Sequence, residues 1–236
     1  MQHQTNILGQ PIGFSLPNWQ PPEFPSGEPM VGHFCCVEPL NLLHAESLHT
    51  ANLMDIDGRM WTYLPYGPFA TLESYSDWVE QICHQRDPLF YAIIDKTTNK
   101  AIGVASYLRI VPEIGSIEVG HICYSPLLQR TPAATEAMFL MMKRSFALGY
   151  RRYEWKCNAL NAPSCNAARR LGFSFEGVFR QATIVKGCNR DTAWFSIIDR
   201  EWPALKNAFE RWLDPINFDE VGKQRLRLSE IITSKL

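Results

Sequence analysis

The chain has 236 residues, of which 46% are hydrophobic and 12% aromatic, enough to bury one sizeable core in a single domain with extensions. The formal net charge of −1 and the pI of about 6.6 exclude a strongly basic surface, so we expect neither nucleic acid nor a membrane as partner. Because no apolar run reaches membrane-spanning length and residues 1–5 show no signal-peptide pattern, we expect a cytoplasmic protein.

The first 30 residues hold six prolines and three glycines, a composition that disfavours helix and central strand. They also carry four large apolar side chains, Phe14, Leu16, Trp19 and Phe24. Disordered tails seldom carry so many large apolar groups. We therefore predict that residues 1–30 form an arm docked on a domain that covers 31–200.

Hydrophobic periodicity predicts a succession of strands and helices in this domain. The predicted strands cover 32–38, 89–95, 100–110, 116–124, 151–157, 173–185 and 190–198, and the predicted helices cover 39–53, 71–86, 131–148 and 162–171. Short turns make the second, third and fourth strands an antiparallel meander. A helix at 202–212 and a tail complete the region 201–236.

Residues 120–137 are the most informative segment. A β-branched strand runs into a Ser-Pro break, then into small residues, and then into a helical pattern that begins near Thr131 with Pro132 in its first turn. The N–H groups at a helix start have no intrahelical acceptor, and the helix macrodipole favours an anion there. The segment therefore predicts a cradle for a pyrophosphate group.

A second segment, 158–173, follows about thirty residues later, where a strand ends in Asn161-x-x-Ser164, a short helix follows, and Gly172 ends it. In order, spacing and residue types, the two segments resemble motifs A and B of the GNAT acetyltransferases, and among these the ribosomal-protein alanine acetyltransferases. The resemblance covers about residues 31–200. It implies an α+β fold with a central mixed, mostly antiparallel sheet of six to seven strands flanked by helices, and acetyl-CoA as cofactor.

The family signature Gln/Arg-x-x-Gly-x-Gly/Ala corresponds here to residues 129–134, with Pro132 in place of the first glycine. Proline has no N–H, so one donor of the cradle is missing. The resemblance implies that the cofactor contacts Gln129, Arg130, Thr131, Ala133, Ala134 and Thr135 in this loop, Ile122, Cys123 and Tyr124 in the preceding strand, and Asn161, Ser164 and Asn166 in the second segment. In the family, the backbone equivalent to 122–124 pairs with the pantetheine arm as a strand would.

Attack on a thioester requires a neutral amine, so we expect a general base. Glu118 is the first candidate, because it resembles a family Glu that stands two residues before a Gly and faces the cleft. The alternative is that Glu118 points to solvent from a half-buried strand. His121, whose intrinsic pKa lies near neutrality, is the second candidate. Strand alternation places it on the face opposite Glu118 unless a bulge intervenes.

A proton must also reach the departing thiolate. Ala168 stands where many GNAT enzymes carry a tyrosine for this role. The resemblance to the alanine acetyltransferases assigns the role to Ser164 instead, although Ser164 also fits as an ordinary hydroxyl in the first turn of a helix.

The loop at 55–69 is expected to wall the acceptor side with Trp61, Tyr63 and Tyr66, close to aspartates at 55 and 57. Aromatic walls beside carboxylates suit a cationic or amphipathic amine. The same aromatic side chains also suit a loop that is merely stapled to the core.

The seven cysteines, at positions 35, 36, 83, 123, 157, 165 and 188, form no C-x-x-C pair and have no histidine at zinc spacing. We expect reduced thiols that fill the core and no metal site.

These features predict an acetyl-CoA-dependent N-acetyltransferase. The acetyl group would pass directly to a primary amine, of a protein N-terminus or a small molecule, in a ternary complex on a monomer or homodimer. Two alternatives stay open: a catalytically degenerate CoA-binding module, which the departures at Pro132 and Ala168 favour, and transfer of another acyl chain or to a hydroxyl.

Overall fold

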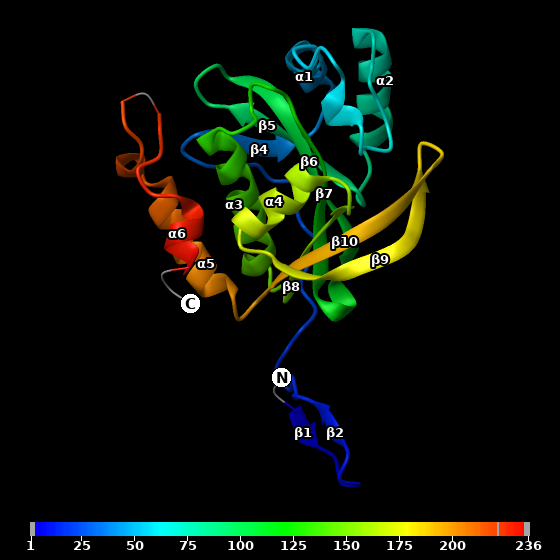
Figure 1. The fold of residues 1–236 in the computed structure, drawn as a ribbon, viewed down its shortest axis with the longest axis vertical. Coiled ribbons are helices and arrows are strands. Elements are labelled where there is room, and N and C mark those ends of the chain that lie inside the picture. The colour runs from blue at the N-terminus through cyan, green and yellow to red at the C-terminus, as the bar shows by residue number, and fades with distance from the viewer. Residues whose placement is uncertain (1–2, 221, 234–236) are drawn as a thin grey trace.

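The computed structural model describes residues 3–220 and 222–233, so the first two residues of the predicted arm and the last three of the predicted tail lie outside it. An eight-stranded sheet runs through the domain in the order β3-β4-β5-β6-β7-β8-β10-β9 (Figure 1). Its strands are β3 (Met30–Val31), β4 (Cys35–Pro39), β5 (Leu89–Asp95), β6 (Lys100–Val111), β7 (Ser116–Tyr124), β8 (Arg152–Asn158), β9 (Ser174–Val185) and β10 (Cys188–Ile198). Neighbouring strands pair antiparallel except β7 and β8, which are parallel. The predicted mixed, mostly antiparallel sheet is confirmed, and the two-residue β3 adds a strand to the expected six to seven.

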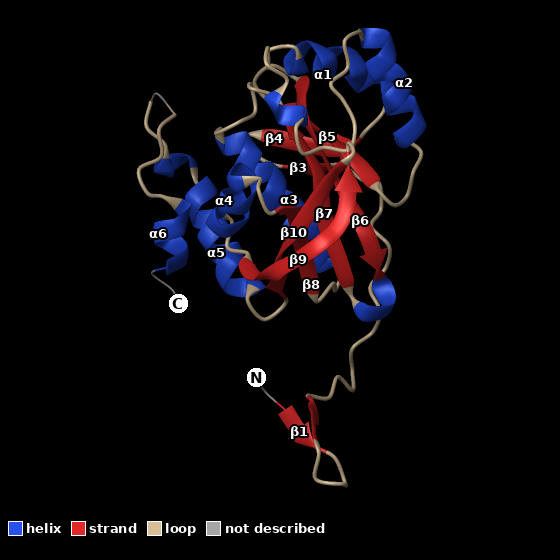
Figure 2. Cartoon of the chain, turned by 45° about the vertical axis from the view of Figure 1, so that its right-hand side comes forward, coloured by secondary structure: helices blue, strands red, loops and turns tan. Residues whose placement is uncertain are grey.

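Helices pack on both faces of the sheet (Figure 2). One face carries α1 (Ala45–Asn52) and α2 (Leu72–Ile82), and the other carries α3 (Pro132–Ala147), α4 (Ala162–Arg170), α5 (Trp202–Leu213) and α6 (Leu228–Thr233). Short 3-10 helices lie at η1 (Leu42–His44), η2 (Arg59–Trp61), η3 (Pro112–Ile114) and η4 (Pro215–Asn217). Alternate residues of β5 enter the two cores, with Phe90 packed in the α1/α2 core and Tyr91 in the α3/α5 core.

The helix α3 begins where the sequence predicts. Thr131 is its N-cap, and its hydroxyl accepts a hydrogen bond from the N–H of Ala134 at 3.2 Å. Pro132 occupies the first helical position, where no N–H is needed. Further along, the buried carboxylate of Glu136 accepts the N–H groups of residues 33–35 at 2.6 to 2.8 Å. This contact ties the loop between β3 and β4 to the helix that opens the predicted cradle.

The N-terminal arm departs from the prediction. Residues 3–13 form an exposed hairpin, β1 (His3–Thr5) with β2 (Pro11–Gly13), that projects away from the domain (Figure 1). Phe14 and Leu16 remain 47% and 41% exposed, so the expected docking is wrong for this part. The hairpin is closed locally, because Asn6 Oδ1 accepts the N–H groups of residues 8 and 10. Within the described ranges, no helix is long and apolar enough to cross a membrane.

Candidate active site

The parallel strands β7 and β8 separate partway along their length. Their pairing runs from Ser116 opposite Arg152 to Val119 opposite Trp155, and no further pair joins them within the described chain. β7 nevertheless continues to Tyr124, directly before the loop that leads to α3, and β8 continues to Asn158, before α4. Beyond Val119 and Trp155 the facing edges of β7 and β8 are unpaired within the described chain, and we call this break in the ladder the opening. The N-termini of α3 and α4 follow the two strands that border it (Figure 1).

A β-bulge lies in β7 at the point where the strands separate. His121 has a positive φ of 49°, and the pairing with β6 shifts register between Val104 and Ser106. Val119 enters the α3/α5 core, so Glu118 points to the opposite face. The His121 ring lies 5.0 Å from Phe90, on that same α1/α2 face. The bulge therefore brings the two predicted base candidates to one side of the sheet, which a regular strand would not do.

Glu118 is buried and paired with two cations. Its carboxylate lies 2.8 Å from Arg109 Nη1 and 2.9 Å from Lys156 Nζ, and Lys156 also contacts Glu154 at 2.7 Å. Burial raises the pKa of Glu118, against the opposing pull of Lys156 and Arg109. Glu118 thus does not point to solvent. Sequence reasoning missed both cations, because Arg109 and Lys156 come from different strands and only the fold brings them together.

His121 is a neutral imidazole at physiological pH. Burial, helped by the nearby Arg109 and Arg190, lowers its pKa to about 4. Its ring stacks on Tyr66 with the centroids 5.6 Å apart. Nδ1 is buried and has no hydrogen-bond partner within the described chain. An uncharged imidazole with one buried, unpaired nitrogen is therefore packed against this face of the sheet.

The loop before α3 supplies fewer free donors than the sequence predicts. The N–H of Thr131 donates to Leu128 O at 3.3 Å, and the N–H of Ala134 is capped by the Thr131 hydroxyl. As the fourth residue of the helix, Thr135 donates within it. The N–H groups of Arg130 and Ala133 have no acceptor among the described residues. Arg130 has a φ of 63°, a conformation that a non-glycine residue seldom adopts.

Other predicted contacts are used to build the site. The side chain of Gln129 donates to Tyr124 O at 2.8 Å, and the Tyr124 hydroxyl donates to Ala134 O at 3.3 Å. Ile122 packs against the α3/α5 core, whereas Cys123 is buried in the α1/α2 core. These side chains pack against or hydrogen-bond to the protein itself. A ligand at this edge would therefore contact the backbone N–H and C=O groups of the strand and the loop.

Ser164 lies on the other border of the opening, in the first turn of α4. Its N–H donates to Asn161 Oδ1 at 3.1 Å, which makes Asn161 the N-cap of that helix, whereas Asn166 is exposed. The Ser164 hydroxyl oxygen accepts the indole N–H of Trp155 at 3.0 Å. An indole nitrogen donates but does not accept, so the hydroxyl proton of Ser164 is directed to an acceptor other than Trp155, and the sulfur of Cys157 lies within its reach.

The predicted acceptor wall lies on the α1/α2 side of the opening. Trp61 packs edge-on against Tyr66, and Tyr63 reaches across to Leu160 O at 3.2 Å. At the tip of the β9–β10 hairpin, Lys186 Nζ donates to the carbonyls of Trp61 and Gly67, both at 2.9 Å. The hairpin thus holds the aromatic loop at Trp61 and Gly67, and the β8–α4 turn holds it between them at Tyr63. No group of three or more metal-ligating side chains occurs in residues 3–220 and 222–233.

Comparison with known proteins gives consistent results. The acetyltransferase (GNAT) domain model matches residues 35–174. A GCN5-related N-acetyltransferase from Brucella melitensis is 46% identical, with a TM-score of 0.90, and the match covers 92% of this chain and all of that one. The uncharacterized N-acetyltransferase p20 of Bacillus licheniformis is 27% identical over 150 residues, 62% of this chain and 84% of its own length. A ribosomal L7/L12 α-N-protein acetyltransferase, RimL, solved with coenzyme A, shares the fold at 24% identity and a TM-score of 0.62 over 73% and 99% of the two chains.

Proposed function

We propose an acceptor and a mechanism from one premise: the chain belongs to the GNAT acetyltransferase family and is an N-acetyltransferase. The proposal is direct transfer of an acetyl group from acetyl-CoA to a primary amine, of a protein N-terminus or of a small molecule, in a ternary complex. The observation that carries it is the opening between β7 and β8, which exposes a strand edge, a helix N-terminus and the Ser164 hydroxyl together.

The residues around the opening fit acetyl-CoA. The unpaired edge at 121–124 has the form of a strand that still lacks a neighbour, which suits an extended amide-bearing arm. The free N–H groups of Arg130 and Ala133, with the Arg130 guanidinium, suit a pyrophosphate. When bound, acetyl-CoA supplies the acetyl group in activated thioester form. Asn161 helps through its cap on α4, and Asn166 remains a proposed contact.

We assign the base to Glu118 and an orienting role to His121. Burial raises the pKa of Glu118 and lowers that of His121, so burial favours proton uptake by Glu118 and disfavours it at His121. Arg109 and Lys156 hold Glu118 in place. Because His121 Nδ1 is buried, an incoming amine would meet the ring at Nε2, which can accept its hydrogen bond in the matching tautomer.

Ser164 is the proposed acid. Trp155 fixes the position of its oxygen, and its proton, which can reach Cys157 Sγ, would turn to the departing sulfur. Ala168, where many relatives carry a tyrosine, is completely buried in the α3/α5 core and offers no hydroxyl. Proton delivery from this side of the opening therefore falls to Ser164.

Acetylation of a panel of amines, followed by mass spectrometry, tests the function. Transfer to an amine is expected, with initial rates that give intersecting double-reciprocal lines; parallel lines would indicate a covalent acyl-enzyme and refute direct transfer. Calorimetry with coenzyme A tests the cradle. Arg130→Glu is expected to weaken binding at least tenfold, and Lys143→Glu, an equal charge change on an exposed residue near the other end of α3, is expected to change it less than twofold.

The alternatives give different results in the same assays. A degenerate module binds coenzyme A and acetylates nothing. An enzyme for another acyl chain uses a longer acyl-CoA as donor in preference to acetyl-CoA. An enzyme for a hydroxyl acceptor acylates alcohols in preference to amines. Size-exclusion with light scattering separates the proposed monomer from the homodimer.

A further inference from the structure

Arg190, on β10, is a cation without a partner. Its Nε is buried and has no hydrogen bond, and its two Nη groups make no hydrogen bond or ion pair within residues 3–220 and 222–233. The side chain is only partly buried, so the Nη groups, unlike Nε, remain open to a ligand. A guanidinium that has lost part of its water usually gains an anion in return, because an unpaired charge inside a protein is costly.

The strands around Arg190 supply no counter-charge for it. Glu118 acts on the charge of Arg190, but Arg109 at 2.8 Å and Lys156 at 2.9 Å already bind this carboxylate. Burial lowers the pKa of Arg190, as expected of a cation that has given up water without gaining an anion of its own. The side chain is therefore suited to an anion that a ligand brings.

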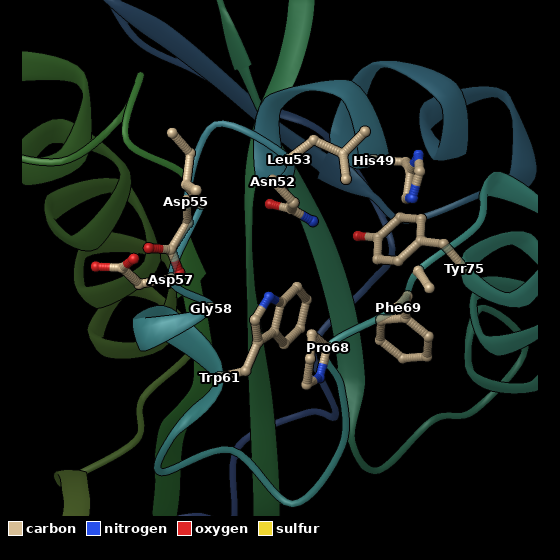
Figure 3. Close-up of a pocket in the computed structure, with 12 residues that line it drawn as sticks. His49, Asn52, Leu53, Asp55, Asp57, Gly58, Trp61, Pro68, Phe69 and Tyr75 are labelled. Carbon is tan, nitrogen blue, oxygen red and sulfur yellow. The ribbon is translucent and has the colours of Figure 1, made fainter.

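The aromatic loop at 55–69 brings no carboxylate to Arg190 either. Its acidic residues, Asp55 and Asp57, line a cavity between α1 and η2 (Figure 3), and no residue of β7 or β10 lines that cavity. Asp57 is paired with Arg59. Both carboxylates of the loop thus belong to a different space.

Strand alternation places Arg190 on the face of the sheet that carries Glu118. The ring of Trp194, opposite Lys156 in the β8–β10 ladder, lies 3.9 Å from Lys156 Nζ, and Lys156 binds Glu118. Arg190 precedes Trp194 by an even number of residues, and the extra residues at the nearby register shift lie in β9, so β10 keeps its alternation. Arg190 and the proposed reaction centre therefore share the α1/α2 face.

Arg190 and His121 also lie towards the same end of the sheet, on either side of β8. The β7–β8 ladder ends at Val119, before His121, and the β8–β10 ladder ends at Thr192, with Arg190 beyond it. Because β8 is parallel to β7 and antiparallel to β10, both side chains lie towards the carboxyl end of β8. They are close enough for Arg190 to help lower the pKa of His121.

The predicted acceptor wall is attached to the protein on both sides of Arg190. Lys186, earlier in the same hairpin, donates to two carbonyls of the aromatic loop at 2.9 Å. On the other side, Asp191 O accepts the N–H of Ala159 at 2.8 Å, in the β8–α4 turn that also accepts the Tyr63 hydroxyl. Arg190 thus belongs to the acceptor side of the opening.

We propose that Arg190 binds a carboxylate of the acceptor through its two Nη groups, while the amine of the same molecule is acetylated beside Glu118 and His121. A planar guanidinium presents parallel N–H donors that match the two oxygens of a carboxylate. A cation at this place also disfavours the ammonium form of the amine, which must be neutral to attack. The inference rests on the proposed function, and it narrows the acceptor to amines that carry a carboxylate.

Acceptors that differ only in charge test the inference in the full-length enzyme. 4-Aminobutanoate is compared with 4-aminobutanamide, and the peptide Ala-Asp-NH2 with Ala-Asn-NH2, so that the two pairs distinguish a small-molecule acceptor from a peptide. In at least one pair, kcat/KM for the acid is expected to be at least tenfold higher than for the amide.

Variants assign this preference to one side chain. Arg190→Gln should lower the ratio of the two kcat/KM values at least tenfold, and Arg190→Lys, which keeps the charge, should retain part of it. Arg180→Gln, the same charge change at an exposed position of β9, should leave the ratio within twofold of the wild type. Absence of a preference in the wild type, or a preference that survives Arg190→Gln, overturns the inference.

Calorimetric titration with the acetylated acids, 4-acetamidobutanoate and acetyl-Ala-Asp-NH2, separates this inference from the proposed function, because neither has an amine to accept an acetyl group. With coenzyme A present, at least one should bind the wild type and Arg180→Gln, and bind Arg190→Gln at least tenfold more weakly. If neither binds the wild type, the carboxylate site is overturned even if amines are acetylated. Binding without acetylation of any amine retains the site and refutes the proposed function.

Two further readouts exclude other roles for Arg190. Because its guanidinium makes no hydrogen bond or ion pair in the described chain, Arg190→Gln should not lower the midpoint of urea unfolding. If Arg190→Gln weakens only the binding of coenzyme A, the guanidinium serves the cofactor and the inference is overturned. Should Arg190→Gln not fold, the acid–amide comparison in the wild type and in Arg190→Lys still decides the question.

Discussion

Replacement of Glu118 by Gln tests the assigned base most directly. The exchange conserves volume and leaves Lys156 paired with Glu154 at 2.7 Å, while Arg109, whose side chain is 60% exposed, regains water. Glu118→Gln therefore removes about one charge-assisted hydrogen bond and should lower the free energy of unfolding by roughly 1.5–3 kcal/mol. Its effect on the reaction should be greater, because losing a general base lowers the rate about 10²–10⁴-fold, which raises the activation free energy by roughly 3–5 kcal/mol.

Glu154→Gln provides the matched comparison. Glu154 lies directly opposite Glu118 in the β7–β8 ladder and shares Lys156 with it, so its loss perturbs the same network at a similar cost in stability. Urea unfolding should show similar losses for the two variants, while kcat falls at least a hundredfold only in Glu118→Gln. In the wild type, kcat/KM should rise with pH as Glu118 loses its proton, at a pH above the ordinary range of a glutamate because burial raises its pKa. That limb should vanish in Glu118→Gln. Equal kcat losses in both variants, or an unchanged pH limb, would refute the assignment of the base.

Three further perturbations address other parts of the site. Ser164→Ala should lower kcat about a hundredfold with unchanged affinity for coenzyme A, and an unchanged kcat would reduce Ser164 to a first-turn hydroxyl held by Trp155. Burial lowers the pKa of His121 from 6.5 to about 4, so its contribution to the free energy of unfolding should be complete above pH 6.5 and fall by up to ~3 kcal/mol as the pH drops towards 4. In urea titrations His121→Asn, a residue type that tolerates the positive φ, should remove this part of the pH dependence. An unaltered pH dependence in the variant would contradict the burial of a neutral His121. Glu136→Gln turns an amide N–H towards the N–H groups of residues 33–35 and should lower the free energy of unfolding in urea by about 3 kcal/mol. The control Glu46→Gln, at an exposed position of α1, should lower it by less than about 0.5 kcal/mol. Equal losses would show that the Glu136 contact does not stabilise the domain.

Periodicity in the sequence was enough for most of the fold. The apolar run at 89–95 predicted the bounds of β5, and the Thr131-Pro132 pair predicted the N-cap and first turn of α3. These signals are local, since each depends on residues a few positions apart. The prediction for the arm was wrong because it used the same local information. Apolar residues such as Phe14 and Leu16 show that apolar surface exists, but they do not say whether it packs on the domain, and both remain largely exposed.

The chemistry of the site depended on features that a local pattern does not carry. A single extra residue in β7 decides whether His121 faces the α1/α2 core or the α3/α5 core. The residue in the left-handed conformation is His121 itself, and Gly120 before it is a local sign compatible with a bulge that does not fix its position. Likewise, Glu118 was visible in the sequence while Arg109 and Lys156, which set its charge, come from the strands on either side. The bulge has one physical consequence that joins these facts. It places a carboxylate whose pKa burial raises and an imidazole whose pKa burial lowers on one side of the same strand, so that the first suits proton removal and the second suits hydrogen bonding to an uncharged amine.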